Sequence, residues 1–243
     1  MKNLFLTSII LLFTSFGFSQ IPNYVPTNGL KLYMPFNFNI NDESGNGNNG
    51  TASNTTFCLD RNLLPVSALD FAPASSQILI NNLFDYSQKT VNLWIYAYSN
   101  TGGVIKSKHG SLLFGENSIY FWSNSLRMGY SDTAGGGGGT QVFSNPTNTW
   151  VMLTYTRSSD SIRYYLNGLQ NRSSPIGFRA TTTSSSSLST RIGSDGWGEF
   201  DGRIDDIGIW DRALTNCEIS DLYNSQNGSL MTYFFDTIIT SNP

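Results

Sequence analysis

The stretch VNLWIYA, which spans Val91–Ala97, decides the fold of this chain. Aliphatic residues alternate in it with polar or aromatic ones, and a period of two is typical of a strand with one buried face. The stretch WVMLTYTR, Trp150–Arg157, is another strong strand candidate. Asn167-Gly168 separates two more such runs, Ile162–Leu166 and Leu169–Asn171, which favours a type I′ hairpin. The sequence therefore predicts strands and hairpins as its main elements.

Short strands recur along the rest of the chain, evenly spaced and broken by turn residues. We expect them at residues 30–36, 103–107, 118–122, 125–130, 187–193 and 202–210. This spacing favours an all-β sandwich. The five glycines at 135–139 are expected to be flexible. One helix is expected near the end, because Thr215 and Glu218 form a capping box and apolar residues then recur at helical spacing.

The first 19 residues are typical of a secretory signal. Lys2 precedes an apolar run at residues 4–16, and Gly17-Phe18-Ser19 offers small residues to a signal peptidase, so cleavage is predicted before Gln20. A membrane anchor is disfavoured, because the run is too short and lacks a stop-transfer flank. We therefore expect a secreted or cell-surface protein with one domain at residues 20–226. The sequence leaves the role of the tail at 227–243 open.

Charge and cysteine content limit the partners. The chain has 14 Lys and Arg against 17 Asp and Glu with no basic run, which makes nucleic acid a poor partner. No later segment is long and apolar enough for a membrane span. Cys58 and Cys217 are the only cysteines, and export permits a disulfide between an early loop and the last helix. Zinc is not expected with two cysteines and one histidine.

The stretch NDESGNGNNG, Asn41–Gly50, has no apolar side chain. Its glycines supply positive φ, which Asn and Asp also tolerate, so the loop crowds side-chain and backbone oxygens into a tight turn. Calcium prefers six to eight such oxygens. The alternative is a polar surface turn, and composition alone leaves both interpretations open.

The two ends of the chain resemble bacterial laminin-G-like, concanavalin A-like domains. The resemblance is carried by residues 27–51, by the closing segment Phe200–Thr215 and by a central strand at Val91–Ile95 that includes Trp94. It implies a jelly-roll sandwich of two antiparallel sheets in which the first and last strands are neighbours. The signal and the residues after it resemble those of exported Bacteroidetes proteins.

The same resemblance brings the Asp42 loop close to Asp205 and Asp206, and so implies a structural calcium site. Strict alternation would put Ile204 and Asp206 on one face of the last strand and Asp205 on the other. We therefore expect Asp206 to reach the ion, with Asp205 in reserve and Asp42 as the loop carboxylate. Further oxygens are expected from Ser44, Asn46 and Asn48. In the alternative hypothesis, Asp206 only accepts hydrogen bonds from the loop.

The function favoured by the sequence is a non-catalytic binding module for carbohydrate or another surface glycan, because sugar rings pack on exposed aromatic faces beside polar groups. Trp197, between two glycines, is the best exposed candidate. Trp94 and Trp150 are instead expected in the core or on a sheet face. The other aromatic candidates are Trp122, Tyr130 and Tyr98, and the polar candidates are Asn124, Asp132, Asp195 and Glu199.

Two alternatives stay open. A glycoside hydrolase of the same fold would need two carboxylates that face each other, and the chain has no Glu-x-Asp-x-x-Glu strand, so no catalytic residue is assigned. His109, the only histidine, is expected in an exposed turn. The other alternative is a structural or adhesion domain that binds a surface protein.

Overall fold

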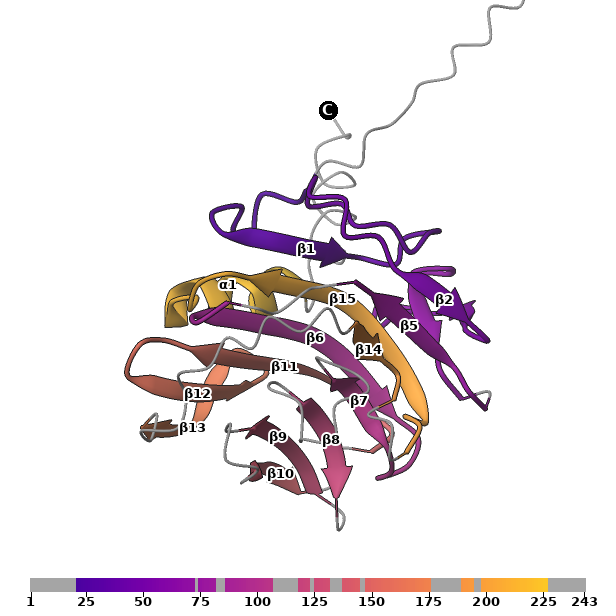
Figure 1. Cartoon of the computed structure of the whole chain (residues 1–243). Helices are drawn as coiled ribbons and strands as arrows, with labels where there is room; N and C mark the ends of the chain where they lie inside the picture. Colours follow the sequence, from indigo (N-terminus) through magenta and orange to yellow (C-terminus); the bar gives the residue numbers. More distant parts are fainter. Residues whose placement is uncertain are drawn as a thin grey trace, which may run out of the picture.

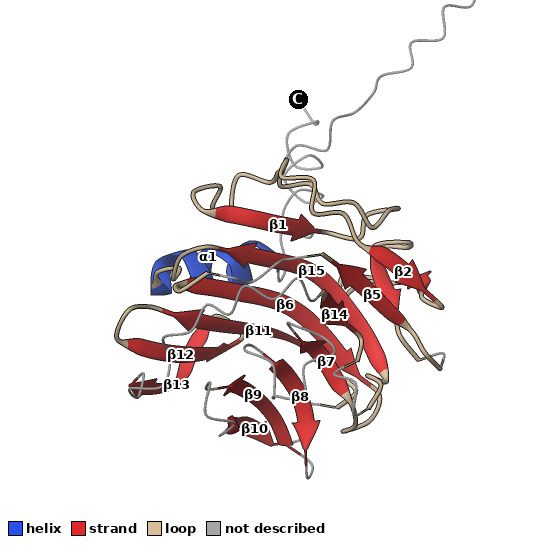
Figure 2. Ribbon diagram, viewed as in Figure 1, coloured by secondary structure: helices blue, strands red, loops and turns tan. Residues whose placement is uncertain are grey.

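The computed structural model describes residues 21–72, 74–81, 86–106, 118–122, 125–131, 137–144, 147–175, 189–194 and 198–226. The signal predicted at 1–19 and the tail at 227–243 lie outside these residues. The described chain forms two antiparallel sheets and one helix, α1 (Asn216–Gln226), which packs on the strands of one sheet (Figures 1 and 2). The predicted all-β jelly-roll sandwich with a short C-terminal helix is therefore confirmed. No helix among these residues is long and apolar enough to cross a membrane.

The first sheet, sheet A, has the strand order β13-β12-β11-β6-β15-β4-β3, and β1 also pairs with β15. The expected pairing of the first and last strands is thus confirmed. The strands of sheet A are β1 (Leu30–Met34), β3 (Thr56–Cys58), β4 (Ala68–Asp70), β6 (Lys89–Ala97), β11 (Trp150–Arg157), β12 (Ser161–Leu166), β13 (Leu169–Pro175) and β15 (Gly202–Trp210).

The second sheet, sheet B, has the order β10-β9-β8-β7-β14-β5-β2. Its strands are β2 (Thr51–Ser53), β5 (Gln77–Ile80), β7 (Gly103–Lys106), β8 (Ser118–Trp122), β9 (Ser125–Ser131), β10 (Gly137–Ser144) and β14 (Thr190–Ile192). The expectation of a flexible glycine run is wrong for Gly137–Gly139, because these residues pair with Gly129–Ser131 of β9. Backbone pairing with β9 holds the three glycines in a strand.

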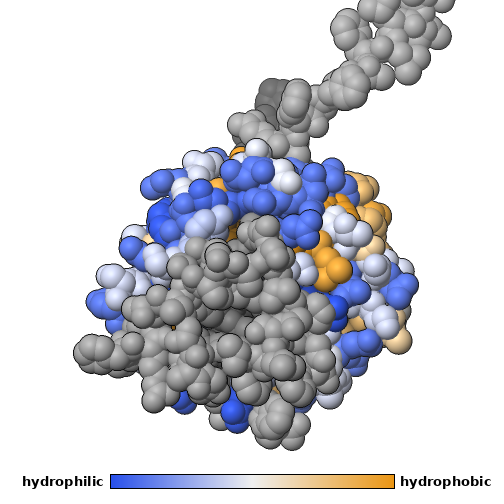
Figure 3. Space-filling model, in the orientation of Figure 1, coloured by the Kyte–Doolittle hydropathy of each residue, from blue (hydrophilic) through white to orange (hydrophobic). Residues whose placement is uncertain are grey.

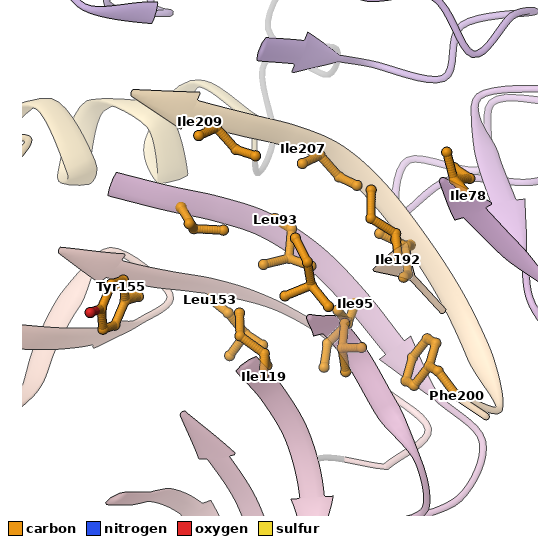
Figure 4. Close-up of a cluster of buried hydrophobic side chains, with 14 of the residues drawn as sticks. Ile78, Leu93, Ile95, Ile119, Leu153, Tyr155, Ile192, Phe200, Ile207 and Ile209 are labelled. Atoms are coloured by element: carbon orange, nitrogen blue, oxygen red, sulfur yellow. The ribbon is translucent and has the colours of Figure 1, made fainter. Parts of the chain in front are cut away.

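The core lies between the two sheets, where alternate residues of both meet. Leu93 and Ile95 of β6 and Ile207 and Ile209 of β15 belong to one buried cluster, which Figure 4 shows. A second cluster covers the outer face of sheet A, where α1 packs over Trp94 and Met152 through Ile219 and Leu222. The surface over the described residues in Figure 3 is mostly hydrophilic, with smaller apolar areas.

Two local predictions are confirmed in detail. Asn167 and Gly168 both have positive φ, 50° and 77°, as a type I′ turn between β12 and β13 requires. The backbone N–H of Glu218 donates to the hydroxyl of Thr215, and the N–H of Thr215 donates to the carboxylate of Glu218. This reciprocal pair starts α1 at the expected residue.

The predicted disulfide is wrong, because Cys58 and Cys217 are both free. Cys58 lies on β3 and pairs with Ala68 of β4. The next residue of β4, Leu69, pairs with Ile204, which is near the start of β15. Cys217 follows the other end of that strand, after Trp210. Ile204 and Trp210 are six residues apart, so these two ends of β15 are separated by about 20 Å, whereas a disulfide spans about 7 Å at most between Cα atoms.

The two thiols should differ in reactivity. Burial raises the pKa of Cys58 to about 11, whereas Cys217 is exposed on α1. Because the thiolate is the reactive form, iodoacetamide at pH 8 should alkylate Cys217 in the native protein and leave Cys58 mostly unmodified. Peptide mass spectrometry without reductant would measure this. Protection of both cysteines until a reductant is added would instead restore the bridge.

Candidate functional site

The last strand carries a bulge at its centre. β15 pairs with β6 along its length, but Asp205 lies opposite Trp94 and Gly208 lies opposite Asn92, so β15 has one extra residue there. The extra residue is accommodated at Asp206, whose φ of 46° is uncommon for a residue other than glycine. The extra residue resets the alternation, so that Ile204, Ile207 and Ile209 all face the core.

The bulge corrects the expected side-chain directions. Asp206 was expected on the face of Ile204, opposite Asp205, but both carboxylates point to the outer side of sheet A and bind the same arginine. One edge of β15 pairs with β6, and its opposite edge pairs with two different strands: β4 at Ile204 and β1 at Ile207. The two carboxylates lie at the point where β4 and β1 separate. We call the hollow at this divergence the fork pocket.

The fork pocket has a volume of about 310 Å³. Most of its lining is polar, and its walls come from the N-terminal segment, the loops after β1 and β3, the bulge and the end of α1. The lining residues are Pro22, Tyr24, Tyr33, Pro35, Asn37, Asp60, Arg61, Asn62, Leu64, Ser67, Asp205, Asp206, Ser225 and Gln226.

A buried ion cluster forms the floor of the pocket. Arg61 Nη1 donates to Asp205 Oδ2 at 2.5 Å, and Nη2 donates to Asp206 Oδ2 at 2.7 Å. Arg61 Nε donates to the backbone carbonyl of Gln226 at 2.9 Å, and the guanidinium lies 4.6 Å from the ring centroid of Trp94. One side chain thus ties the loop after β3 to β15, to β6 and to the end of α1.

Two further side chains complete the polar wall. The hydroxyl of Tyr33 donates to Asp206 Oδ1 at 3.3 Å. Asp60 is only 6% exposed and accepts the backbone N–H groups of Asn62 and Leu64 through Oδ1. The pocket lining therefore contains three aspartates and one arginine.

Burial sets the protonation of this cluster. It raises the pKa of Asp205 well above its usual range, and the neighbouring Asp206 raises it further. Burial also raises the pKa of Asp206, although Arg61 opposes the rise. The pKa of Tyr33 is raised well above its usual value by burial and by Asp206, so its hydroxyl stays a neutral donor. Carboxyl groups that titrate unusually in a pocket mark a candidate functional site.

The predicted metal ligands form two separate sets. Asp42 Oδ1 accepts the N–H groups of Tyr33 at 3.0 Å and Ser44 at 2.9 Å, and Oδ2 accepts that of Asn48 at 2.8 Å. Asp205 and Asp206 bind Arg61 instead. The alternative hypothesis, in which Asp206 accepts hydrogen bonds from the loop, is wrong, because the N–H groups of Ser44 and Asn48 donate to Asp42.

The rest of the loop closes on itself in the same way. Amide nitrogens of Asn46 and Asn48 donate to the carbonyls of Leu30 and Lys31, and the hydroxyl of Ser44 also donates to Lys31. In the structure the Asp42 oxygens accept N–H donors, and the loop lies apart from the Asp205 and Asp206 carboxylates that bind Arg61. Within the described part of the chain, no group of three or more His, Cys, Asp or Glu is placed to hold a metal. Calcium binding itself stays a prediction.

The predicted ligand-binding residues are not brought together in the described chain. Trp197 and Asp195 lie outside the described residues, as do Asn124, Asp132 and His109. Trp122 and Tyr130 lie on β8 and β9 of sheet B. Glu199 is exposed and forms backbone bridges with Gly103 and Ser194. Trp94 is buried and Trp150 is partly exposed on the outer face of sheet A, as expected.

The fork pocket was not predicted from the sequence. Its residues Tyr24, Asn37, Asp60 and Arg61 belong to loops and to the N-terminal segment, which have no periodic pattern. The doublet Asp205-Asp206 inside an apolar strand was the one visible signal, and it was assigned to the metal.

Comparisons with known proteins agree with this architecture. Residues 74–220 match the family model described as the concanavalin A-like lectin/glucanases superfamily. No curated protein matches the sequence significantly. Among solved structures, domain 4 of AbnA, a GH43 extracellular arabinanase from Geobacillus stearothermophilus, in complex with arabinotriose, superposes with a TM-score of 0.65 and 20% identity. The match covers 80% of this chain and 98% of that one.

Toxin domains are similar as well. The binding domain of Paraclostridial Mosquitocidal Protein 1 has a TM-score of 0.65 and 16% identity, over 82% of this chain and 53% of that one. The receptor binding domain of the botulinum neurotoxin C/D mosaic serotype has a TM-score of 0.64 and 18% identity, over 83% and 52%. This chain thus spans about half of each toxin domain, and the likeness concerns the fold.

Proposed function

Because the chain belongs to the concanavalin A-like lectin/glucanases superfamily, we propose that it is an exported, non-catalytic module that binds a neutral glycan. The fork pocket carries this proposal. Its volume of about 310 Å³ is at the small end of ligand pockets, and its walls offer hydroxyl, amide and carboxylate groups to the hydroxyls of a sugar. The predicted signal at residues 1–19 supports export.

The charge of the pocket selects among sugars. The lining has three aspartates, Asp60, Asp205 and Asp206, and Arg61 already binds two of them, so it offers no free cation to a uronate or a sulfated sugar. A neutral sugar can instead donate its hydroxyls to the carboxylates. The arabinotriose bound to domain 4 of AbnA is neutral and supports the same ligand class.

Hydrolysis is disfavoured by the arrangement of the acids. The raised pKa of Asp205 would suit a general acid, but Asp205 and Asp206 are adjacent and bind the same guanidinium. A glycosidase needs its two carboxyl groups on either side of the bond to be cleaved, roughly 5–9.5 Å apart. Two acids held together by one cation do not provide this geometry.

Affinity electrophoresis tests the proposal. The protein should be retarded in a gel that contains linear arabinan, galactan, xyloglucan or mixed-linkage β-glucan, but not in polygalacturonate. Asn37→Ala and Asn62→Ala, which alter the pocket wall without touching the ion cluster, should each weaken binding about fivefold, the value of one hydrogen bond. Asn171→Ala, on β13, is the matched control.

Two results would overturn the proposal. One is the absence of retardation by every neutral glycan. The other is retardation that neither pocket variant reduces. An assay for new reducing ends on the same glycans should stay at background, and a steady release of sugar would show that the module is catalytic.

A further inference from the structure

A line of side chains crosses the outer face of sheet A beside the fork pocket. Trp150 of β11 lies opposite Tyr96 of β6, Tyr96 lies opposite Arg203 of β15, and Arg203 lies opposite Asp70 of β4. Directly opposed residues of antiparallel strands project from the same face. Tyr98, just beyond the end of β6, joins them, and we call these five residues the aromatic row.

Short contacts fix the row in place. The ring centroid of Tyr96 is 5.7 Å from that of Trp150 and 5.7 Å from that of Tyr98. The Arg203 guanidinium lies 5.6 Å from each tyrosine ring. Arg203 Nε donates to the Tyr98 hydroxyl at 2.6 Å, and that hydroxyl donates to Asp70 Oδ2 at 2.7 Å. These contacts hold the rings in place before any ligand arrives, which lowers the entropy cost of binding.

The row lies beyond the region that α1 covers. At Trp94, the outer face is occupied by Tyr223, whose ring is 5.7 Å away, and by Gln226 at the helix end, which accepts the indole N–H. Two residues further along β6, Tyr96 is partly exposed, and so are Trp150 and Tyr98. Three aromatic side chains therefore reach the solvent where the helix stops.

The row and the fork pocket form one continuous strip. Arg203 and Asp205 are two residues apart on the outer side of β15, and Tyr96 and Trp94 are two apart on β6. Two residues of strand span about 7 Å. Asp70 lies 3.6 Å from Arg203 and balances its charge, so the row favours an uncharged partner.

From this geometry we propose that the aromatic row is a second carbohydrate subsite, on which sugar rings pack against Trp150 and Tyr96 while the same chain enters the fork pocket. This inference rests on the proposed function and makes the ligand an oligosaccharide or polysaccharide. The rings of Trp150 and Tyr96 are inclined by 60°, so they offer no flat shelf. They fit a chain whose successive sugar rings turn, and not the flat surface of crystalline cellulose.

The test uses Trp150→Leu and Tyr96→Leu, which keep an apolar side chain on the sheet but remove the ring. The affinity is measured by electrophoresis in a gel that contains the neutral polysaccharide that retards the parent most. Each variant should bind this polysaccharide about tenfold more weakly, because the ring face that the sugar covers is lost. Tyr86→Leu is the control, since Tyr86 is a partly exposed tyrosine near Lys31, at the other end of sheet A. It should bind as the parent does. Crystalline cellulose should not sediment the protein.

The outcomes separate the two proposals. If the pocket variants lose affinity while both row variants bind as the parent does, the row is no subsite and the proposed function stands. If the parent is not retarded by any neutral glycan, both proposals fall. Thermal melts identify a variant that is unfolded, and the methionine variant at the same position then replaces it. This variant also lacks the aromatic ring, so unchanged affinity in it would overturn the subsite.

Discussion

Replacing Arg61 with alanine should lower the free energy of unfolding by about 3–5 kcal/mol at pH 7, because two buried carboxylates lose their only cation. For a domain of this size the loss corresponds to a fall in Tm of roughly 6–20 °C. The variant also loses the contact with Trp94 and the hydrogen bond to the end of α1. Thermal and denaturant melts of the purified protein measure the effect.

The penalty should shrink as the pH falls. Burial raises the pKa of Asp205 and Asp206 in the folded protein, and Arg61 holds both values down. Without Arg61, both pKa values rise further. The pKa of an aspartate in the unfolded chain is about 3.9. When its pKa in the folded protein is higher, the folded state loses stability as the pH rises from the unfolded pKa to the folded pKa. The variant should therefore be closest to the parent near pH 4 and furthest from it at neutral pH.

Two further variants sharpen this result. Arg172→Ala removes an exposed arginine from β13 and should change the Tm by little. Adding Asp205→Asn to Arg61→Ala should recover part of the loss, because one buried charge disappears. An Arg61→Ala protein that melts with the parent at pH 7 would contradict the ion cluster described above.

Asp42→Ala should cost about 2–4 kcal/mol, because three backbone N–H groups lose a charged acceptor at once. One of the three belongs to Tyr33, so the damage reaches β1. Asp42→Asn keeps one acceptor oxygen and should fall between the alanine variant and the parent. Asn41→Ala, at the exposed neighbouring position, is the control.

The same variants decide between the loop's own hydrogen bonds and a metal. Equal losses for Asp42→Ala in calcium and in EDTA would mean that the Asp42 oxygens act only as acceptors of the three N–H groups. A Tm that calcium raises in the parent and leaves unchanged in Asp42→Ala would instead support the predicted calcium site.

Much of the fold follows from local sequence patterns. The strands at Ser118–Trp122, Trp150–Arg157 and Gly202–Trp210 have the predicted bounds, because each is rich in β-branched and aromatic residues. The short strands β2 to β5 were not predicted, since three or four residues cannot show a period. The glycine strand β10 was missed for a different reason: glycine is depleted in strands, yet Gly137–Gly139 pair with β9.

The site was less accessible to sequence analysis. Ile204, Ile207 and Ile209 are spaced by three and then two residues, and this break in alternation is the signature of a bulge. It could have placed both aspartates on one face. Their partner could not be found in this way, because Arg61 is 144 residues from Asp205 and lies in an irregular loop in which Leu63 and Val66 have positive φ.

The central position of β15 has a consequence for folding. This strand bonds to β1, β4 and β6, yet it is the last strand of the described chain. Pairings between residues so distant in sequence form slowly, since the entropy of closing a long loop is lost before the contacts are gained. Sheet A therefore cannot be completed until residues 202–210 have left the ribosome. Until then, the edge of β6 that pairs with β15 remains open, and nascent chains are most prone to aggregate during that time.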